Sequence, residues 1–108
     1  MKLVHLAFVF SMFVFASTAM CEEITPSRLD ELKMDCDTCH GVNGHSPIPA
    51  QVPSIAGKNE RFIFSQLKAF EAGKRQHETM TFMGESMNDT EMRAIARYYS
   101  RRPYPKKM

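Results

Sequence analysis

One run of five residues constrains this chain more than any other feature. Positions 36–40 read C-D-T-C-H, two cysteines separated by two residues and followed at once by a histidine. This C-x-x-C-H pattern is typical of the attachment site for c-type haem. Two thiols three positions apart can each bond a vinyl group on one porphyrin edge, and the next imidazole then faces the iron. We therefore interpret Cys36 and Cys39 as covalent anchors and His40 as an axial iron ligand.

Other chemistries also use closely spaced cysteines. A zinc site would combine Cys36 and Cys39 with two of His40, His45 and His77, but no second tight pair of ligands follows in the sequence. A thioredoxin-like redox pair needs a surrounding βαβ pattern, which we do not find. A chance match to the motif is the third alternative. Covalent haem is the interpretation that the rest of the sequence has to fit.

The N-terminal residues have the layout of a secretory signal peptide. Lys2 provides a positive start, an apolar run covers residues 3–16, and small residues then precede an acidic pair at 22–23. The apolar run is short for a membrane span. We expect cleavage after Ala19 or after Cys21. The alternatives are a retained membrane anchor and a lipid-modified Cys21.

Removal of the signal peptide, residues 1–21, leaves one small domain over residues 22–108. Its loss removes Lys2, one of the 14 basic residues, and none of the 12 acidic ones, which leaves a formal charge of +1. A near-neutral balance argues against nucleic acid as a partner. Both remaining cysteines are used by haem, so no disulfide is needed in an oxidising compartment. We expect a periplasmic monomer with no membrane span.

The mature part predicts an all-α fold of three or more helices wrapped around one haem. A proline at position 26 favours a helix start there, and glycines with three prolines make residues 41–57 a loop. The last helix has the clearest start, with Asn88 as N-cap and Glu91 as its capping-box partner. We expect helices from about residue 25, over 59–72 and from residue 88, separated by loops over 41–57 and 74–87.

Apolar spacing predicts the faces that these helices bury. On the first helix, Leu29, Leu32 and Cys36 share one face, so an attachment cysteine lies on the apolar side. Met87 and Met92 have the spacing of a hydrophobic staple at the start of the last helix. The remaining predicted stripes are Phe62, Ile63, Gln66, Leu67 and Phe70 on the second helix, and Met92, Ile95, Ala96 and Tyr99 on the last.

The second axial position of the iron has several candidate ligands. A methionine thioether stabilises ferrous iron, so a His/Met pair raises the reduction potential relative to a His/His pair. Met80 and Met83 fall in the middle of the predicted 74–87 loop, with enough free chain to cross the far face of the haem. The residues alone favour Met80 over Met83 and His77. Less suitable are Met34, which shares the attachment helix, Met87 and Met92, which are needed for packing, and His45, which follows His40 too closely.

Four segments resemble class I cytochromes c. Residues 36–44 extend the haem motif to C-x-x-C-H-G-x-x-G, and residues 53–57 read P-S-I-A-G, like the family's P-x-L-A-G. Residues 62–75 read F-I-x-x-Q-L-x-x-F-x-x-G-x-R where the family has Y-L-x-x-Q-L-x-x-F-x-x-G-x-R. Residues 80–89 read M-x-x-x-G-x-x-M-N-D, like M-x-x-x-A-x-x-L-S-D. The resemblance covers nearly all of 33–100 and is closest to the small single-haem bacterial type and to one half of the two-haem bacterial cytochromes.

The resemblance implies a role for each matching residue. The backbone carbonyl of Pro53 would accept a hydrogen bond from the axial histidine, which orients the ring and makes it a better donor to iron. Ile55 would pack on the haem. The departures from the family are Gly84 for alanine, Met87 for leucine and Phe82 where proline is frequent. The implied haem contacts are thioether bonds at Cys36 and Cys39 and axial bonds from His40 and Met80.

The expected function is one-electron transfer in the periplasm, with transient redox proteins as donor and acceptor. No catalysis of a substrate is expected, because a His/Met iron has no open position. Two alternatives are a haem subunit of a periplasmic dehydrogenase and a gas sensor, in which the Met80 loop would swing away at Gly84. Small interfaces suit transient partners, and the predicted rim charges are Lys33, Lys58, Lys74 and Arg75.

Overall fold

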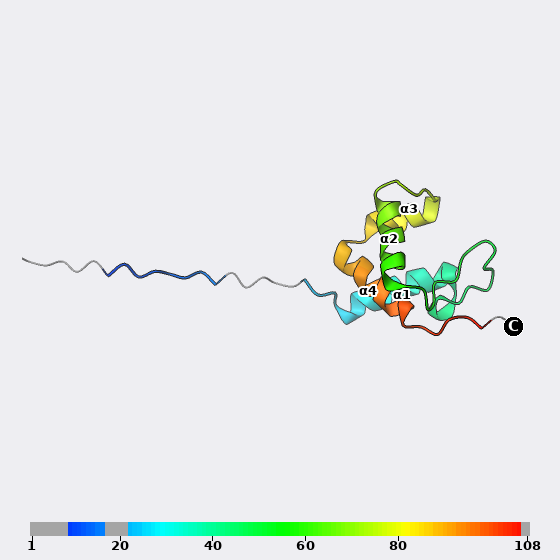
Figure 1. Ribbon diagram of the computed structural model, residues 1–108, viewed down its shortest axis with the longest axis horizontal. Helices are drawn as coiled ribbons and strands as arrows, with labels where there is room; N and C mark the ends of the chain where they lie inside the picture. Colours follow the sequence, from blue (N-terminus) through cyan, green and yellow to red (C-terminus); the bar gives the residue numbers. More distant parts are fainter. Residues whose placement is uncertain (1–8, 17–21, 107–108) are drawn as a thin grey trace, which may run out of the picture.

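Helices are the only regular secondary structure among the residues that the computed structural model describes, 9–16 and 22–106. The elements are α1 (Pro26–His40), a 3-10 turn η1 (Val42–Gly44), α2 (Glu60–Glu71), α3 (Glu78–Ser86) and α4 (Asp89–Ser100). Helix α2 packs on both α3 and α4, and α4 packs on α1 (Figure 1). The all-α prediction is confirmed.

The leader is only partly described. Residues 9–16 form neither helix nor strand, and their apolar side chains are exposed. Within the described ranges, no helix has the length and apolar character needed to cross a membrane. The predicted cleavage positions, Ala19 and Cys21, lie outside the described residues. The signal peptide therefore stays a prediction.

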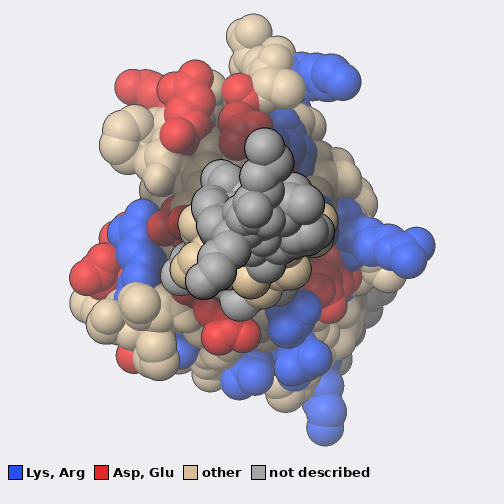
Figure 2. All heavy atoms as spheres, turned by 90° about the vertical axis from the view of Figure 1, so that its left-hand side faces the viewer, with Lys and Arg blue, Asp and Glu red and all other residues tan. Residues whose placement is uncertain are grey.

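Charged side chains of both signs are spread over the surface. Figure 2 shows one face, on which Lys and Arg are interspersed with Asp and Glu, and a row of basic side chains follows the lower edge. Salt bridges tie several of these charges together in pairs, such as Lys68 with Asp89 at 2.7 Å and with Glu71 at 2.6 Å. The charges on this face are therefore of mixed sign.

The start and end of α1 follow from local chemistry. The Thr25 hydroxyl accepts a hydrogen bond from the backbone N–H of Arg28 at 3.2 Å, and Pro26 occupies the first turn. The helix ends at His40 because Gly41 takes φ 83° and ψ 164°. A Cβ at Gly41 would collide with the backbone carbonyl of His45. These signals fix where the attachment motif stops being helical.

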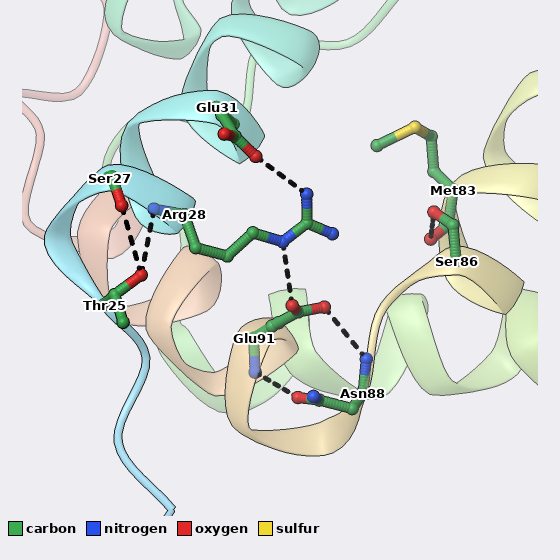
Figure 3. A network of polar contacts seen from close by, with 8 residues as sticks. All are labelled: Thr25, Ser27, Arg28, Glu31, Met83, Ser86, Asn88 and Glu91. Atoms are coloured by element: carbon green, nitrogen blue, oxygen red, sulfur yellow. Dashed lines mark hydrogen bonds and ion pairs between the residues drawn. The ribbon is translucent and has the colours of Figure 1, made fainter.

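The predicted capping box of α4 is present and is connected to α1. The Asn88 side chain accepts from the backbone N–H of Glu91 at 2.9 Å, and the Glu91 carboxylate accepts from the backbone N–H of Asn88 at 3.2 Å. The other carboxylate oxygen of Glu91 accepts from Nε of Arg28 at 2.9 Å (Figure 3). One glutamate therefore caps α4 and joins it to the first turns of α1.

This pair predicts an acid-side loss of stability. The hydrogen bond from Arg28 lowers the pKa of Glu91 below its ordinary value of 4.5. A carboxylate with a depressed native pKa stabilises the fold fully above pH 4.5 and loses that contribution as the pH falls through the native pKa. We expect Glu91→Gln to flatten the dependence of the unfolding free energy on pH below 4.5, measured by urea titration.

The matched control for Glu91→Gln is Glu31→Gln, because Glu31 contacts the same Arg28 guanidinium at 3.2 Å from a more exposed position. We expect this control to change the acid-side slope less than Glu91→Gln does, because the Glu31 side chain is 66% exposed and that of Glu91 15%. Equal slopes in the wild type and in Glu91→Gln would contradict the role assigned to the pair.

The core lies where α2, α4 and the middle of α1 meet. The stripe predicted on α4 is confirmed, and Tyr99 is fully buried. The prediction that Phe62 shares the buried face of α2 is wrong, because its side chain is 51% exposed. The buried face contains Ile63 and Leu67, and Phe62 is rotated about 100° from Ile63 around the helix axis. The buried cluster consists of Leu32, Ile63, Leu67, Met87, Met92, Ile95, Ala96 and Tyr99.

The loop expected over residues 74–87 is wrong, because it contains α3. Two features produce this helix, and neither is a strong local signal. Its N-cap is His77, whose Nδ1 accepts from the backbone N–H of Met80 at 3.3 Å. Gly84 brings α3 against α2, where an added Cβ would lie 2.8 Å from the backbone nitrogen of Glu71. The helix therefore depends on a tertiary contact that periodicity does not encode.

Candidate haem-binding site

The attachment motif occupies the last turns of α1. Cys36 is partly buried against the core, Cys39 is exposed, and the two thiols are free rather than joined in a disulfide. Because the cysteines are three positions apart on a helix, they lie on the same side, one turn from each other. Their side chains are therefore available to one cofactor edge.

The environment of Cys36 keeps its thiol protonated. Burial, followed by the negative charge of Asp37, raises the pKa of Cys36 to about 12. The thiolate is the species that attacks a disulfide, so a thiol with a raised pKa exchanges slowly. This environment disfavours a Cys36–Cys39 disulfide in the folded chain.

His40 is 8% exposed, and a backbone carbonyl orients its ring. Its Nδ1 lies 2.7 Å from the carbonyl oxygen of Pro53. A carbonyl can only accept, so the proton is on Nδ1 and the lone pair is on Nε2. Nε2 makes no hydrogen bond with residues 22–106. The imidazole is thus held in the tautomer that binds a metal through Nε2.

The loop that carries Pro53 is folded back on the end of α1. The backbone N–H groups of Ile55 and Ala56 donate to the carbonyl of Gly44 at 2.9 and 3.2 Å. The backbone N–H of Gly57 donates to the carbonyl of Tyr99 at 2.9 Å, which joins the loop to α4. Ile55 is partly buried and contacts the core. These bonds place the Pro53 carbonyl at the His40 ring.

The two methionine candidates lie on α3. Their positions relative to His40 are therefore fixed by the packing of this helix and not by a free loop. Met80 and Met83 are both partly buried and packed against the core. In Figure 1 the end of α1 and the beginning of α3 lie at the same side of the molecule, one above the other. In Figure 3 the Met83 side chain points toward the turn of α1 that bears Arg28 and Glu31. That turn is nine or more residues before His40, about 14 Å along a helix.

One polar network at the site was not predicted. The hydroxyl of the buried Tyr99 donates to Oδ1 of Asp37 at 2.6 Å, and it also lies 3.2 Å from the carbonyl oxygen of Lys33. Oδ2 of Asp37 accepts from the backbone N–H of Asn43 at 3.4 Å. A buried tyrosine needs a partner for its hydroxyl, which is the signal that the sequence offered. The partner is 62 positions away and has no local signature.

The donors at this site fit a covalent haem. They comprise two free thiols, an imidazole with its Nε2 available, and thioether sulfurs on a separate helix, which is the set that c-type haem uses. Zinc would need four close ligands. In the part of the chain that the structure describes, no group of three or more His, Cys, Asp and Glu residues is placed to hold a metal ion.

Comparisons with known proteins agree with this chemistry. Residues 31–100 match the model of the protein family described as cytochrome c. The chain is 31% identical over 84 residues to the cytochrome subunit of sulfide dehydrogenase from Chlorobaculum tepidum, covering 78% of this chain and 74% of that protein. It is 35% identical over 65 residues to cytochrome c4 from Pseudomonas aeruginosa, covering 60% of this chain and 32% of the relative.

A third relative is cytochrome c-554(548) from Halomonas halodenitrificans, 32% identical over 68 residues that cover 60% of this chain and 81% of the relative. Coverage differs sharply among these relatives. The match spans only 32% and 35% of the two cytochrome c4 relatives from Pseudomonas aeruginosa and Stutzerimonas stutzeri. The chain thus corresponds to about a third of those longer proteins.

Proposed function

The chain belongs to the cytochrome c family of haem-bearing electron carriers, and we propose that it carries single electrons on one haem c held by four of its side chains. Cys36 and Cys39 would form the thioether bonds, and His40 and Met80 the axial bonds to iron. The bound haem supplies a one-electron couple between Fe(II) and Fe(III). The observation that carries this proposal is the 2.7 Å contact between His40 Nδ1 and the Pro53 carbonyl, which leaves Nε2 available.

Met80 is the second ligand in this proposal, and Met83 is a packing residue. The beginning of α3 lies at the same side of the molecule as the end of α1, which favours Met80. The direction of the Met83 side chain toward the earlier turns of α1 argues against Met83. His77 is occupied in capping α3 through its Nδ1. Ile55 would cover the haem from the loop that holds Pro53.

Export to the periplasm is part of the same proposal. The layout of residues 1–21 supports removal of a signal peptide, which leaves residues 22–108 as the mature domain. The large apolar side chains of residues 9–16 are exposed, as expected of a segment that does not contribute to the folded core. The mature domain would be a monomer, and it would bind its electron donor and electron acceptor proteins transiently.

The four predicted rim charges differ in whether another side chain of the same molecule already binds them. Lys33 bonds Asp30 at 3.0 Å and lies over the Tyr98 ring, and Arg75 bonds Gln66 at 2.7 Å and lies over the Phe70 ring. Within residues 22–106, Lys58 and Lys74 make no ion pair. We propose Lys58 and Lys74 as the charges most available to a partner.

A second candidate function is that of a haem subunit bound to a dehydrogenase. The relative from Chlorobaculum tepidum favours it, because that protein carries this description and matches 78% of the chain. A free carrier would purify alone, whereas a subunit would purify in a fixed ratio with its enzyme when tagged in its own cell.

The test is expression of the full chain together with a haem-attachment system. We expect one covalent haem per chain, detected by mass and by a low-spin c-type visible spectrum in both redox states. Cys36→Ser with Cys39→Ser should abolish covalent haem completely, whereas Met34→Ser on the same helix, at an exposed position, should leave it unchanged. A wild-type chain without covalent haem would overturn the proposal.

A further inference from the structure

Asp37 lies inside the attachment motif, yet its carboxylate is bound by two other elements. Tyr99 on α4 donates its hydroxyl hydrogen to Oδ1 at 2.6 Å, and the η1 backbone at Asn43 donates to Oδ2 at 3.4 Å. Tyr99 is fully buried, so its hydroxyl cannot exchange this partner for water. The carboxylate is therefore held in one position, between α1 and α4.

The residue directly before Asp37 in α1 is Cys36, which packs against the core cluster that contains Tyr99. The charge of Asp37 is the second cause, after burial, of the raised pKa of the Cys36 thiol. The Cys36 sulfur is the atom proposed to bond the porphyrin. The carboxylate therefore acts on an atom that becomes part of the haem substituents.

The charge of Asp37 is not paired with a cation in the described part of the chain. The nearest basic side chain in the sequence is Lys33, whose ammonium group bonds Asp30 at 3.0 Å and lies 4.5 Å from the centre of the Tyr98 ring. Asp37 itself makes no salt bridge with residues 22–106. A fixed, partly buried negative charge favours the more positive state of a nearby group, since the low local dielectric weakens screening.

We propose that the Asp37 carboxylate, held by Tyr99, lowers the reduction potential of the haem attached at Cys36. The inference rests on the proposed haem site. In this arrangement Asp37 stabilises the oxidised iron by its charge, while His40 and Pro53 set the ligand geometry. Tyr99 is the positioning residue, because it acts through the carboxylate that it holds.

The test compares Asp37→Asn with Asp35→Asn in the full-length haem protein. Both variants remove one negative charge next to Cys36 in the sequence, but Asp35 is exposed and its side chain makes no hydrogen bond with residues 22–106. Asparagine at position 37 can still accept the Tyr99 hydrogen bond through its amide oxygen. We expect Asp37→Asn to raise the reduction potential, measured by mediated spectroelectrochemical titration, and Asp35→Asn to raise it less.

Two results would overturn the inference while leaving the haem protein intact. One is an unchanged potential in Asp37→Asn. The other is an equal shift in Asp37→Asn and Asp35→Asn, which would indicate a general effect of net charge. A drop in melting temperature at constant potential would assign Asp37 a purely structural role, which is the first of these results.

A second variant keeps the inference testable if Asp37→Asn does not fold or does not acquire haem. If Asp37→Asn does not acquire haem, Asp37→Ser replaces it, because serine also removes the charge and keeps an acceptor oxygen, one bond closer to the backbone than Oδ1. The same rise in potential is then expected. Absence of covalent haem in the wild type would instead contradict the proposed function, so the two failures are distinguishable.

Discussion

Met80→Ala is expected to remove the methionine-to-ferric-iron charge-transfer band from the visible spectrum and to lower the reduction potential. The thioether favours ferrous iron, so its loss favours the ferric state. Truncating a methionine also removes packing against the core, at a cost of about 2 kcal/mol, the low end for this substitution because Met80 is only partly buried. The measurement is the oxidised spectrum and a redox titration of the haem protein.

Met83→Ala is the matched control, since Met83 is also a partly buried methionine of α3 that contacts the core. It should lose comparable packing energy and keep the band. A band that survives in Met80→Ala and disappears in Met83→Ala would identify Met83 as the axial ligand and Met80 as the packing residue. A band that survives in both would exclude both residues as the ligand.

Gly44→Ala is expected to destabilise the fold by about 2–5 kcal/mol, combining left-handed backbone strain with overpacking. Gly44 has φ 77°, and an added Cβ would lie 2.8 Å from Cδ1 of Tyr99 and 2.9 Å from Cγ1 of Ile55. Neither neighbour can withdraw, because Tyr99 is buried and Ile55 belongs to the loop bonded to Gly44 itself. The measurement is the unfolding free energy from guanidinium titration at equal haem content.

Gly73→Ala separates the two contributions. Gly73 has φ 71°, so alanine there carries the same backbone strain, but no atom lies within 4 Å of the added Cβ. We expect a cost of about 1–2 kcal/mol, from strain alone. An equal loss of unfolding free energy in Gly44→Ala and Gly73→Ala would show that the loop around Gly44 can move to accommodate the added Cβ without overpacking against Tyr99.

Sequence reasoning succeeded where the signal is local. The helix start at Pro26, the capping box of Asn88 with Glu91 and the apolar row on α4 depend on residues within one or two turns, and all are present. The haem motif is equally local, since its cysteines and histidine occupy five consecutive positions. Short-range geometry was therefore enough to predict α1, α2 and α4, and the attachment residues stay a prediction of the same local kind.

The failures involve contacts between distant segments. Helix α3 has a histidine cap, which is not among the preferred N-cap residues, and an interior glycine that lowers helix propensity. Its stability comes from the close approach of Gly84 to α2. The bond between Asp37 and Tyr99 spans 62 positions, so no window of sequence contains both partners. Periodicity cannot report such pairs.

The contacts of Tyr99 also bear on the order in which segments of the chain fold. Its hydroxyl bonds the end of α1, its carbonyl accepts from Gly57, and its ring adjoins Gly44, so one residue of α4 joins three points between residues 37 and 57 that are 42 or more positions before it. Contacts of such long sequence separation form late, because loop-closure entropy must be overcome first. We therefore expect the 41–57 loop to stay open, and Cys36 to stay in contact with water, until the C-terminal helix docks. The interval before docking is the period in which the cysteines are most accessible to the cofactor.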